Sequence, residues 1–89
     1  MKEINFMNIG PLKTVKKSEI VGIFDIDSAS ATAATKRFLV NAENNKKIKS
    51  VGGDIPKSFV LMSNGDVFLS PYASRVLKSR AERNVKLTY

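Results

Sequence analysis

The chain has 89 residues, of which 43% are hydrophobic and 26% are charged, and this length and balance predict one globular domain with a small core. It contains no Cys and no His, which excludes disulfides and thiolate zinc sites and removes the most frequent general base. Lys and Arg number 15 against 8 Asp and Glu, a formal net charge of +7, and this excess favours a polyanionic partner such as nucleic acid.

The apolar residues of the chain occur in short runs. None approaches the ~20 residues that a membrane-spanning helix requires. The first residues, with Lys2 and Glu3 before a short mixed segment, do not resemble a secretory signal peptide. We therefore expect a cytoplasmic protein with no membrane partner.

The first half of the chain predicts three strands and a helix. Residues 4–9 indicate a short strand that ends at Gly10-Pro11, and residues 12–15 allow a second one. Residues 20–26 are mostly Ile, Val and Phe, which predicts a buried strand. Over 31–43 the apolar residues recur at spacings of three and four, which predicts an amphipathic helix. Its expected apolar face comprises Ala31, Ala34, Phe38, Leu39 and Ala42.

The second half predicts three further strands. Residues 46–51 can form a short basic strand before the Gly52-Gly53 loop. Residues 58–62 are nearly all apolar, and Asn64-Gly65 predicts a hairpin that returns through 67–69.

A second helix is expected near the end of the chain. Ser70 resembles an N-cap and Pro71 a first helical residue. The apolar stripe of this helix would comprise Ala73, Val76, Leu77 and Ala81. This element order predicts an α+β fold with a small, mainly antiparallel sheet and two helices. We expect a single domain over 1–83 and a loosely ordered tail over 84–89.

The Asp-Ile-Asp sequence after the apolar run has two interpretations. In the first, Asp25 and Asp27 lie on one face at a strand end and share a magnesium ion in a phosphoryl-transfer enzyme. In the second, Asp27, Ser28 or Ser30 caps the following helix and the acid interacts favourably with the helix dipole. No other acid occurs in a similar strand-end context, so we favour the cap, which leaves Asp25 without a role.

Basic residues gather in three groups along the chain, with Lys57 between two of them. Each contact between such a residue and a phosphate would release counterions and add salt dependence. The five phenylalanines, Phe6, Phe24, Phe38, Phe59 and Phe68, all fit core positions, so duplex binding through the backbone is favoured over base stacking. The candidate nucleic-acid-binding residues are Lys16, Lys17, Lys46, Lys47, Lys49, Lys57, Arg75, Lys78 and Arg83.

Four stretches of the sequence together resemble a known family. They are IVGIFDID, TKRFL, IPKSFVL and GDVFLSPYASRVLKSRA. Their order and spacing, over roughly 4–81, are similar to the RemA/RemB family of bacterial extracellular matrix (biofilm) regulators. The Pro-Lys-Ser strand and the Leu-Ser-Pro ending are closer to the RemB branch.

This resemblance implies a small, non-enzymatic cytoplasmic protein without a cofactor or a small-molecule substrate. It implies a transcription regulator that forms a ring or another homo-oligomer and contacts double-stranded DNA at many points. Contact through several linked subunits would raise the overall affinity for DNA of a small module that has no helix to read a groove. Assembly would also bury apolar surface that a short chain leaves exposed.

One part of the family pattern is missing from this sequence. RemA contacts DNA through arginines at the start of the strand similar to IVGIF and before the strand similar to KSFVL. Here these positions hold Glu19 and approximately Asp54-Ile55, and Lys57 is the nearest basic residue. Any DNA contact must therefore come from the other candidate residues. The alternative is a structural or protein-interaction module of the same family without DNA binding.

Overall fold

The computed structural model describes residues 5–29, 32–53 and 55–82, and it confirms the predicted α+β fold class. The positions of Ile4, Ala31, Asp54 and Arg83 and of the expected tail over 84–89 lie outside these residues. The elements, in chain order, are β1 (Phe6–Gly10), β2 (Lys13–Lys16), the short helix η1 (Lys17–Glu19), β3 (Ile20–Asp25), α1 (Ile26–Ala29), α2 (Ala33–Asn44), β4 (Ile48–Ser50), β5 (Ser58–Met62), β6 (Val67–Ser70) and α3 (Ser74–Glu82).

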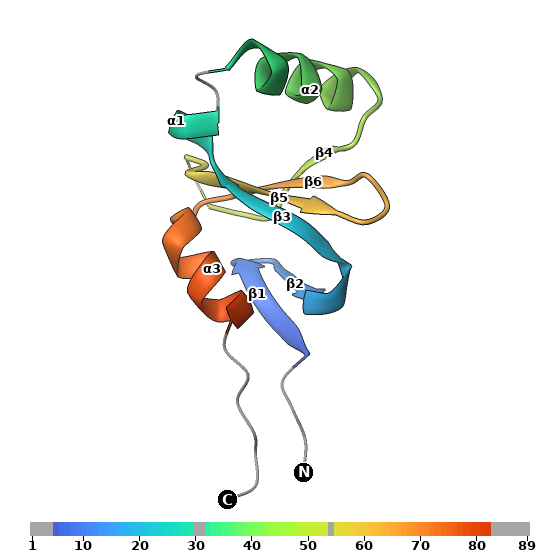
Figure 1. Cartoon of the computed structure of the whole chain (residues 1–89). Helices are drawn as coiled ribbons and strands as arrows, with labels where there is room; N and C mark the ends of the chain where they lie inside the picture. The colour runs from blue at the N-terminus through green and yellow to red at the C-terminus, as the bar shows by residue number, and fades with distance from the viewer. Residues whose placement is uncertain (1–4, 30–31, 54, 83–89) are drawn as a thin grey trace, which may run out of the picture.

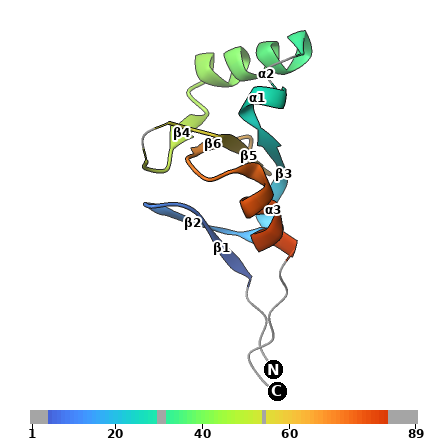
Figure 2. The same ribbon diagram turned by 90° about the vertical axis from the view of Figure 1, so that its left-hand side faces the viewer.

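The molecule has three layers (Figures 1 and 2). The central layer is a four-stranded sheet in the order β3-β5-β6-β4, in which β4 runs parallel to β6 and the other neighbours are antiparallel. Helix α2 lies over one face of this sheet, and α3 and the β1–β2 hairpin lie over the other. Strands β5 and β6 are therefore covered on both faces, whereas β3 and β4 form the edges.

Two apolar clusters hold the layers together. Alternation along β5 sends Phe59 to the α2 side of the sheet and Val60 to the opposite side. The cluster below α2 is small, with Ala42, Phe59 and Val67 buried. The larger cluster lies between the sheet, α3 and the β1–β2 hairpin, and its buried members are Met7, Ile9, Val15, Val51, Val60, Met62, Phe68 and Leu77.

Two buried serines join the central sheet to the layer that contains α3. Ser58 and Ser70 are cross-strand partners in β5 and β6, and both have 0% exposure. The Ser70 hydroxyl donates to the carbonyl oxygen of Ile9 at 2.6 Å and accepts from the amide of Tyr72 at 3.1 Å. The Ser58 hydroxyl donates to the carbonyl oxygen of Tyr72 at 2.7 Å. These bonds satisfy buried backbone groups of β1 and of the segment that enters α3.

The predicted hairpin at Asn64-Gly65 is confirmed. The amide of Gly65 donates to the carbonyl oxygen of Met62 at 3.0 Å, and the amide of Met62 donates to that of Asp66 at 2.9 Å. Gly65 has a φ of +92°, a left-handed conformation that glycine adopts at little cost. The predicted basic strand is also confirmed, as β4.

The third predicted strand is confirmed, but its burial is wrong. Strand β3 ends at Asp25, one residue earlier than expected, because Ile26 begins α1. It is an edge strand, and Val21 and Phe24 are exposed. A short run of Ile, Val and Phe does not distinguish an edge strand from a central one.

Helix α2 is confirmed, but only part of its predicted apolar face is covered by the sheet. Leu39 and Ala42 pack against the sheet. Ala34 and Phe38, which the periodicity places on the same face, are exposed. The helix therefore carries apolar side chains that the described part of the chain does not cover.

The last helix is confirmed, but its predicted start is wrong. Helix α3 begins at Ser74 rather than at Pro71. Ser70 ends β6, and its hydroxyl bonds to Ile9 and Tyr72 instead of capping a helix. Within the expected apolar stripe, Leu77 is fully buried and Val76 is exposed. No helix among the described residues has the length and apolar character to span a membrane.

We predict that Ser70→Ala destabilises the fold by about 1–3 kcal/mol, because it leaves buried backbone groups of Ile9 and Tyr72 without a partner. The free energy of unfolding in urea measures this loss. Ser63→Ala is the matched control, since Ser63 is exposed in the β5–β6 turn, and it should change stability by less than about 0.5 kcal/mol. Equal stability of the two variants would contradict the role given to Ser70.

Candidate nucleic-acid interface

The residues predicted to contact phosphate lie in three regions of the structure. The first is the end of β2 and the start of η1, the second is β4 and the turn before it, and the third lies on and beside α3. Figure 1 shows these elements on different sides of the molecule. Arg83 lies outside the described residues. In the same order, the three regions hold Lys16 and Lys17; Lys46, Lys47 and Lys49; and Lys57, Arg75 and Lys78.

The basic residues of β4 and its preceding turn are partly neutralised. Lys47 and Lys49 place their amines 3.7 Å and 3.6 Å from the two carboxylate oxygens of Asp66. Asp66 also bonds to Asn64 through its backbone amide and its side chain, which makes it part of the β5–β6 turn. The two lysines therefore hold the β5–β6 turn against β4. Lys46 is also exposed, and it forms no ion pair with a described carboxylate.

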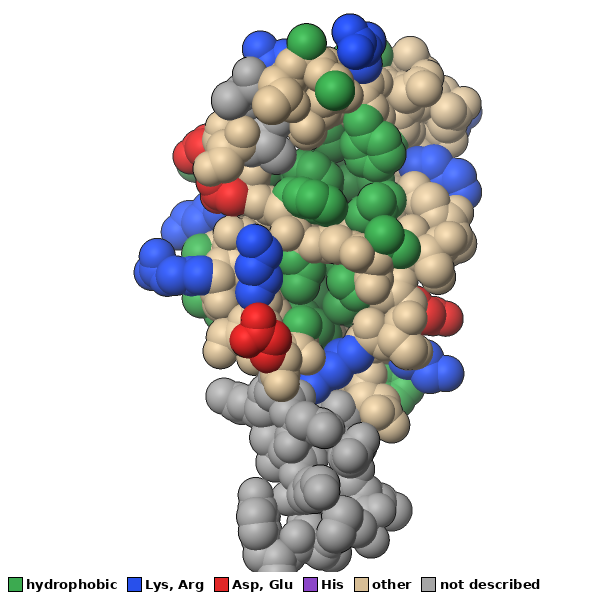
Figure 3. Space-filling view, in the orientation of Figure 1, with side chains coloured by type: hydrophobic (Ala, Val, Ile, Leu, Met, Phe, Trp, Pro, Cys, Tyr) green, Lys and Arg blue, Asp and Glu red, His purple; other side chains and the backbone are tan. Residues whose placement is uncertain are grey.

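The region beside α3 brings together residues that are distant in the sequence. The amide of Lys57 donates to Ser70 at 2.8 Å, and its carbonyl oxygen accepts from the amide of Ile26 at 3.1 Å. These bonds place Lys57 between the end of β3 and the segment before α3. Arg75 and Lys78 are exposed on α3, and Figure 3 shows basic side chains over this helix with acidic side chains nearby.

Asp25 has a structural role that sequence reasoning missed. Its carboxylate accepts hydrogen bonds from the amide and the hydroxyl of Ser28 at 3.1 Å and 3.0 Å, so it caps α1. The cap of α2 is Thr32, whose hydroxyl accepts from the amide of Thr35. The expectation that Asp27 or Ser28 caps this helix is therefore wrong, and the predicted alternative, Ser30, lies outside the described residues.

Phenylalanines are more exposed than expected. Phe6 is 55% exposed, and Phe24 and Phe38 are each 40% exposed, whereas Phe59 and Phe68 are buried. The prediction that all five belong to the core is wrong for three of them. The Phe24 ring stacks on Phe59 with centroids 4.9 Å apart, so one of its faces is covered. Phe6 and Phe38 therefore present ring surface on which a base could stack, contrary to the prediction that buried rings disfavour stacking.

An open apolar groove of about 270 Å³ runs between α2 and the sheet. We call it the α2 groove. Figure 3 shows hydrophobic side chains across β3 and below α2. Gly22 helps to form this surface, because a side chain there would lie 2.6 Å from the Phe24 ring. The groove is lined by Phe24, Ala34, Thr35, Phe38, Phe59 and Leu61.

Two cations outside the predicted set make specific contacts. The Lys13 amine lies 5.1 Å from the centroid of the Phe68 ring. Arg80 donates to the carbonyl oxygen of Asn8 at 3.0 Å, and its guanidinium lies 4.8 Å from the Tyr72 ring, which joins α3 to β1. No local pattern in the sequence signals either contact, because each partner comes from a distant segment.

A comparison with protein families matches residues 6–81 to the RemA-like family, described as "Extracellular matrix regulatory protein A-like". The chain belongs to the RemA-like family. The match runs from the first residue of β1 to nearly the end of α3, so it covers the sheet, both hairpins and the helices. A comparison with curated proteins finds no match.

In this RemA-like chain, the magnesium interpretation of the Asp-Ile-Asp sequence has little structural support. Asp25 bonds to Ser28, and the described residues contain no group of three Asp, Glu, Cys or His side chains that could hold a metal ion. Magnesium sites in proteins use carboxylates together with water and substrate phosphates. The family description names a regulatory protein.

We predict that Asp25→Ala lowers the free energy of unfolding by about 1 kcal/mol, the usual loss for a removed helix cap. Asp27→Ala, two residues further along, serves as the matched control and should have a smaller effect. Urea denaturation without Mg²⁺ measures the loss of stability, and the same measurement in about 10 mM Mg²⁺ reveals a specific site, because a bound ligand stabilises the fold according to the ratio of its free concentration to its Kd. Stabilisation by Mg²⁺ that either substitution abolishes would restore the magnesium interpretation.

Proposed function

We propose that this protein is a non-enzymatic, cytoplasmic transcription regulator of the extracellular matrix type. In this proposal it binds double-stranded DNA through phosphates and does so as a homo-oligomer. Membership of the RemA-like family is the observation that carries the proposal. Its Pro-Lys-Ser strand and its Leu-Ser-Pro ending support the further proposal that it is closer to the RemB branch.

The distribution of charge supports contact with a polyanion. The net charge is +7, and each phosphate contact by an exposed cation adds affinity that falls with salt. Because the cations are spread over three regions, one subunit would place few of them on the same DNA segment. Several linked subunits would multiply these contacts. The exposed candidates outside any ion pair between described residues are Lys16, Lys46, Lys57, Arg75 and Lys78.

The α2 groove supports assembly. Exposed apolar patches on small domains commonly mark interaction surfaces, and Phe24 and Phe38 are each 40% exposed there. A second copy of the chain that covers this groove would bury both rings. The same surface also favours the alternative function, a protein-interaction module without DNA binding.

The DNA proposal predicts a salt-dependent shift of duplex DNA by the full chain. Affinity should fall by at least about tenfold between 50 and 200 mM NaCl, since several phosphates are contacted. Electrophoretic mobility shift or fluorescence anisotropy measures it, and a single strand of the same sequence tests stacking on the exposed phenylalanines. No binding even at the lower salt would contradict the proposal and leave the protein-interaction module.

A charge-matched pair of variants locates the contact surface. Lys57→Gln with Lys78→Gln should weaken duplex binding by at least about tenfold and lower the salt slope by about two, one for each lost phosphate contact. Lys36→Gln with Arg37→Gln removes the same charge from exposed positions on α2 and should have a much smaller effect. Equal losses would mean that net charge alone governs binding.

We predict that Phe38→Ser lowers the oligomeric state without unfolding the chain, because it removes an apolar ring from the α2 groove. Val40→Ser is the control on the same helix. Val40 is also exposed. It lies two positions after Phe38, and this spacing corresponds to a rotation of about 200° around the helix axis, so Val40 faces away from the groove. Size-exclusion chromatography with light scattering gives the mass of each variant. Unchanged mass for Phe38→Ser would exclude the groove as the interface.

A further inference from the structure

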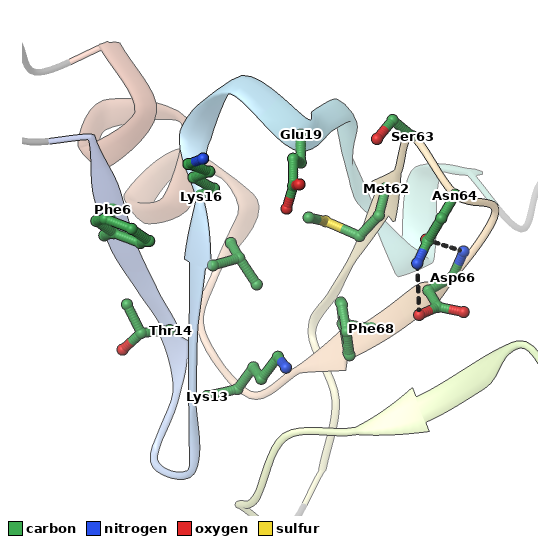
Figure 4. Close-up of a pocket in the computed structure, with 11 residues that line it drawn as sticks. Phe6, Lys13, Thr14, Lys16, Glu19, Met62, Ser63, Asn64, Asp66 and Phe68 are labelled. Atoms are coloured by element: carbon green, nitrogen blue, oxygen red, sulfur yellow. Dashed lines mark hydrogen bonds between the residues drawn. The ribbon is translucent and has the colours of Figure 1, made fainter.

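A cleft of about 420 Å³ opens between β2 and the turn that joins β5 to β6 (Figure 4). One wall is formed by side chains of the β1–β2 hairpin, and the other by residues from Met62 to Phe68. Glu19, the last residue of η1, lies at one end of it. This volume is within the range of pockets that hold small organic ligands.

The floor of the cleft is apolar. Val15, Met62 and Phe68 line it, and all three belong to the larger core cluster. Phe6 adds an aromatic ring that is 55% exposed at the rim. Val15, Met62 and Phe68 are more than nine-tenths buried, so they offer an entering apolar group only a small contact area, and the Phe6 ring offers most of the exposed apolar surface.

Two cations line the same cleft. Lys13 extends across it toward Phe68, with its amine 5.1 Å from the ring centroid (Figure 4). An ammonium group over a ring still has N–H donors that the ring does not satisfy. Lys16 is exposed and lines the cleft from the end of β2. Neither lysine forms an ion pair with a carboxylate of the described residues.

The two acids of the cleft differ in their surroundings. Asp66 has a side chain only 15% exposed, and Lys49 of β4 and Lys47, just before β4, lie close to its carboxylate, so its charge is offset from outside the cleft. The Glu19 carboxylate points into the cleft (Figure 4) and has no cationic partner among the described residues. The cleft therefore holds two cations and one acid without partners of opposite charge.

We propose that this cleft binds a small amphipathic organic anion, of the aromatic carboxylate class. The carboxylate would bond to the Lys13 amine, and Lys16 would add positive charge from the end of β2. The apolar body would lie against the exposed Phe6 ring and the small exposed part of the floor. Glu19 repels the anion and limits the affinity for ligands that carry no N–H donor. This site goes beyond the proposed DNA function, with which it shares only Lys16.

The first experiment titrates the ¹⁵N-labelled full chain with sodium 1-naphthoate, in the absence of DNA, and follows amide chemical shifts. We expect saturable shifts at 13–19 and 62–68, with a Kd below about 1 mM. The alcohol 1-naphthalenemethanol keeps the rings without the charge, and acetate keeps the charge without the rings. Each should bind at least about fivefold more weakly. Equal affinity for the alcohol, or shifts confined to the α2 groove, would overturn the proposal.

The second experiment uses variants with opposite expected signs. Lys13→Gln should weaken naphthoate binding by at least about fivefold, and Glu19→Gln should strengthen it by at least about twofold. Lys36→Gln, which removes the same charge from α2, should leave it unchanged. An equal loss of naphthoate affinity in Lys13→Gln and Lys36→Gln would mean that net charge alone governs binding. Weaker binding by Glu19→Gln would indicate a cation site. Either result would overturn the proposal.

These variants keep the test independent of folding and of DNA binding. Lys13 and Glu19 are exposed, and the amide spectrum of each variant without naphthoate reports whether it folds. If Lys13→Gln alters the fold, the Glu19→Gln variant still tests the proposal, because naphthoate should bind it more tightly than the unmodified chain. Because no DNA is present, failure of the DNA proposal leaves the result unaffected, and failure of this proposal leaves DNA binding unaffected.

Discussion

The hydrogen bonds of the two buried serines are the constraint on which the arrangement of the layers depends. Ser58 and Ser70 face each other at one end of the central strands and bond to backbone groups of Ile9 and Tyr72. A buried carbonyl without a donor is costly, so these bonds fix where β1 and the entry to α3 can lie. Both serines belong to the stretches that identified the family, PKS and LSP, so part of that sequence signature has a structural cause.

The sequence predicts strands and helices well because their periodicity depends on local residues. It predicts burial less well, because periodicity shows which side chains share a face and not what covers that face. Phe38 lies on the apolar side of α2, yet the described part of the chain leaves it 40% exposed. The capping of α1 by Asp25 is missed for another reason. Helix α1 spans only Ile26–Ala29, which is too short to show a helical period in its apolar residues.

The charges illustrate the same limit at the candidate sites. Lys47 and Lys49 look like free cations in the sequence, but the fold brings Asp66 within 4 Å of both. Lys13, one of several lysines near the start of the chain, lies over Phe68. Spacing along the chain cannot show such pairs, since sheet topology creates them. The 15 Lys and Arg residues behind the formal charge of +7 therefore fall into two groups. Some contact other parts of the fold, and others are exposed and can contact a partner.

Helix α2 connects the two edges of the central sheet, because the chain leaves β3 at one edge and enters β4 at the other. It rests on the sheet mainly through Leu39 and Ala42, while the larger core lies on the opposite face. Elements with little buried apolar surface open at low free energy, before the rest of the domain unfolds. The helix can therefore exchange its amide hydrogens through a local opening that keeps β5, β6 and α3 folded, and a partner on α2 would influence both sheet edges together.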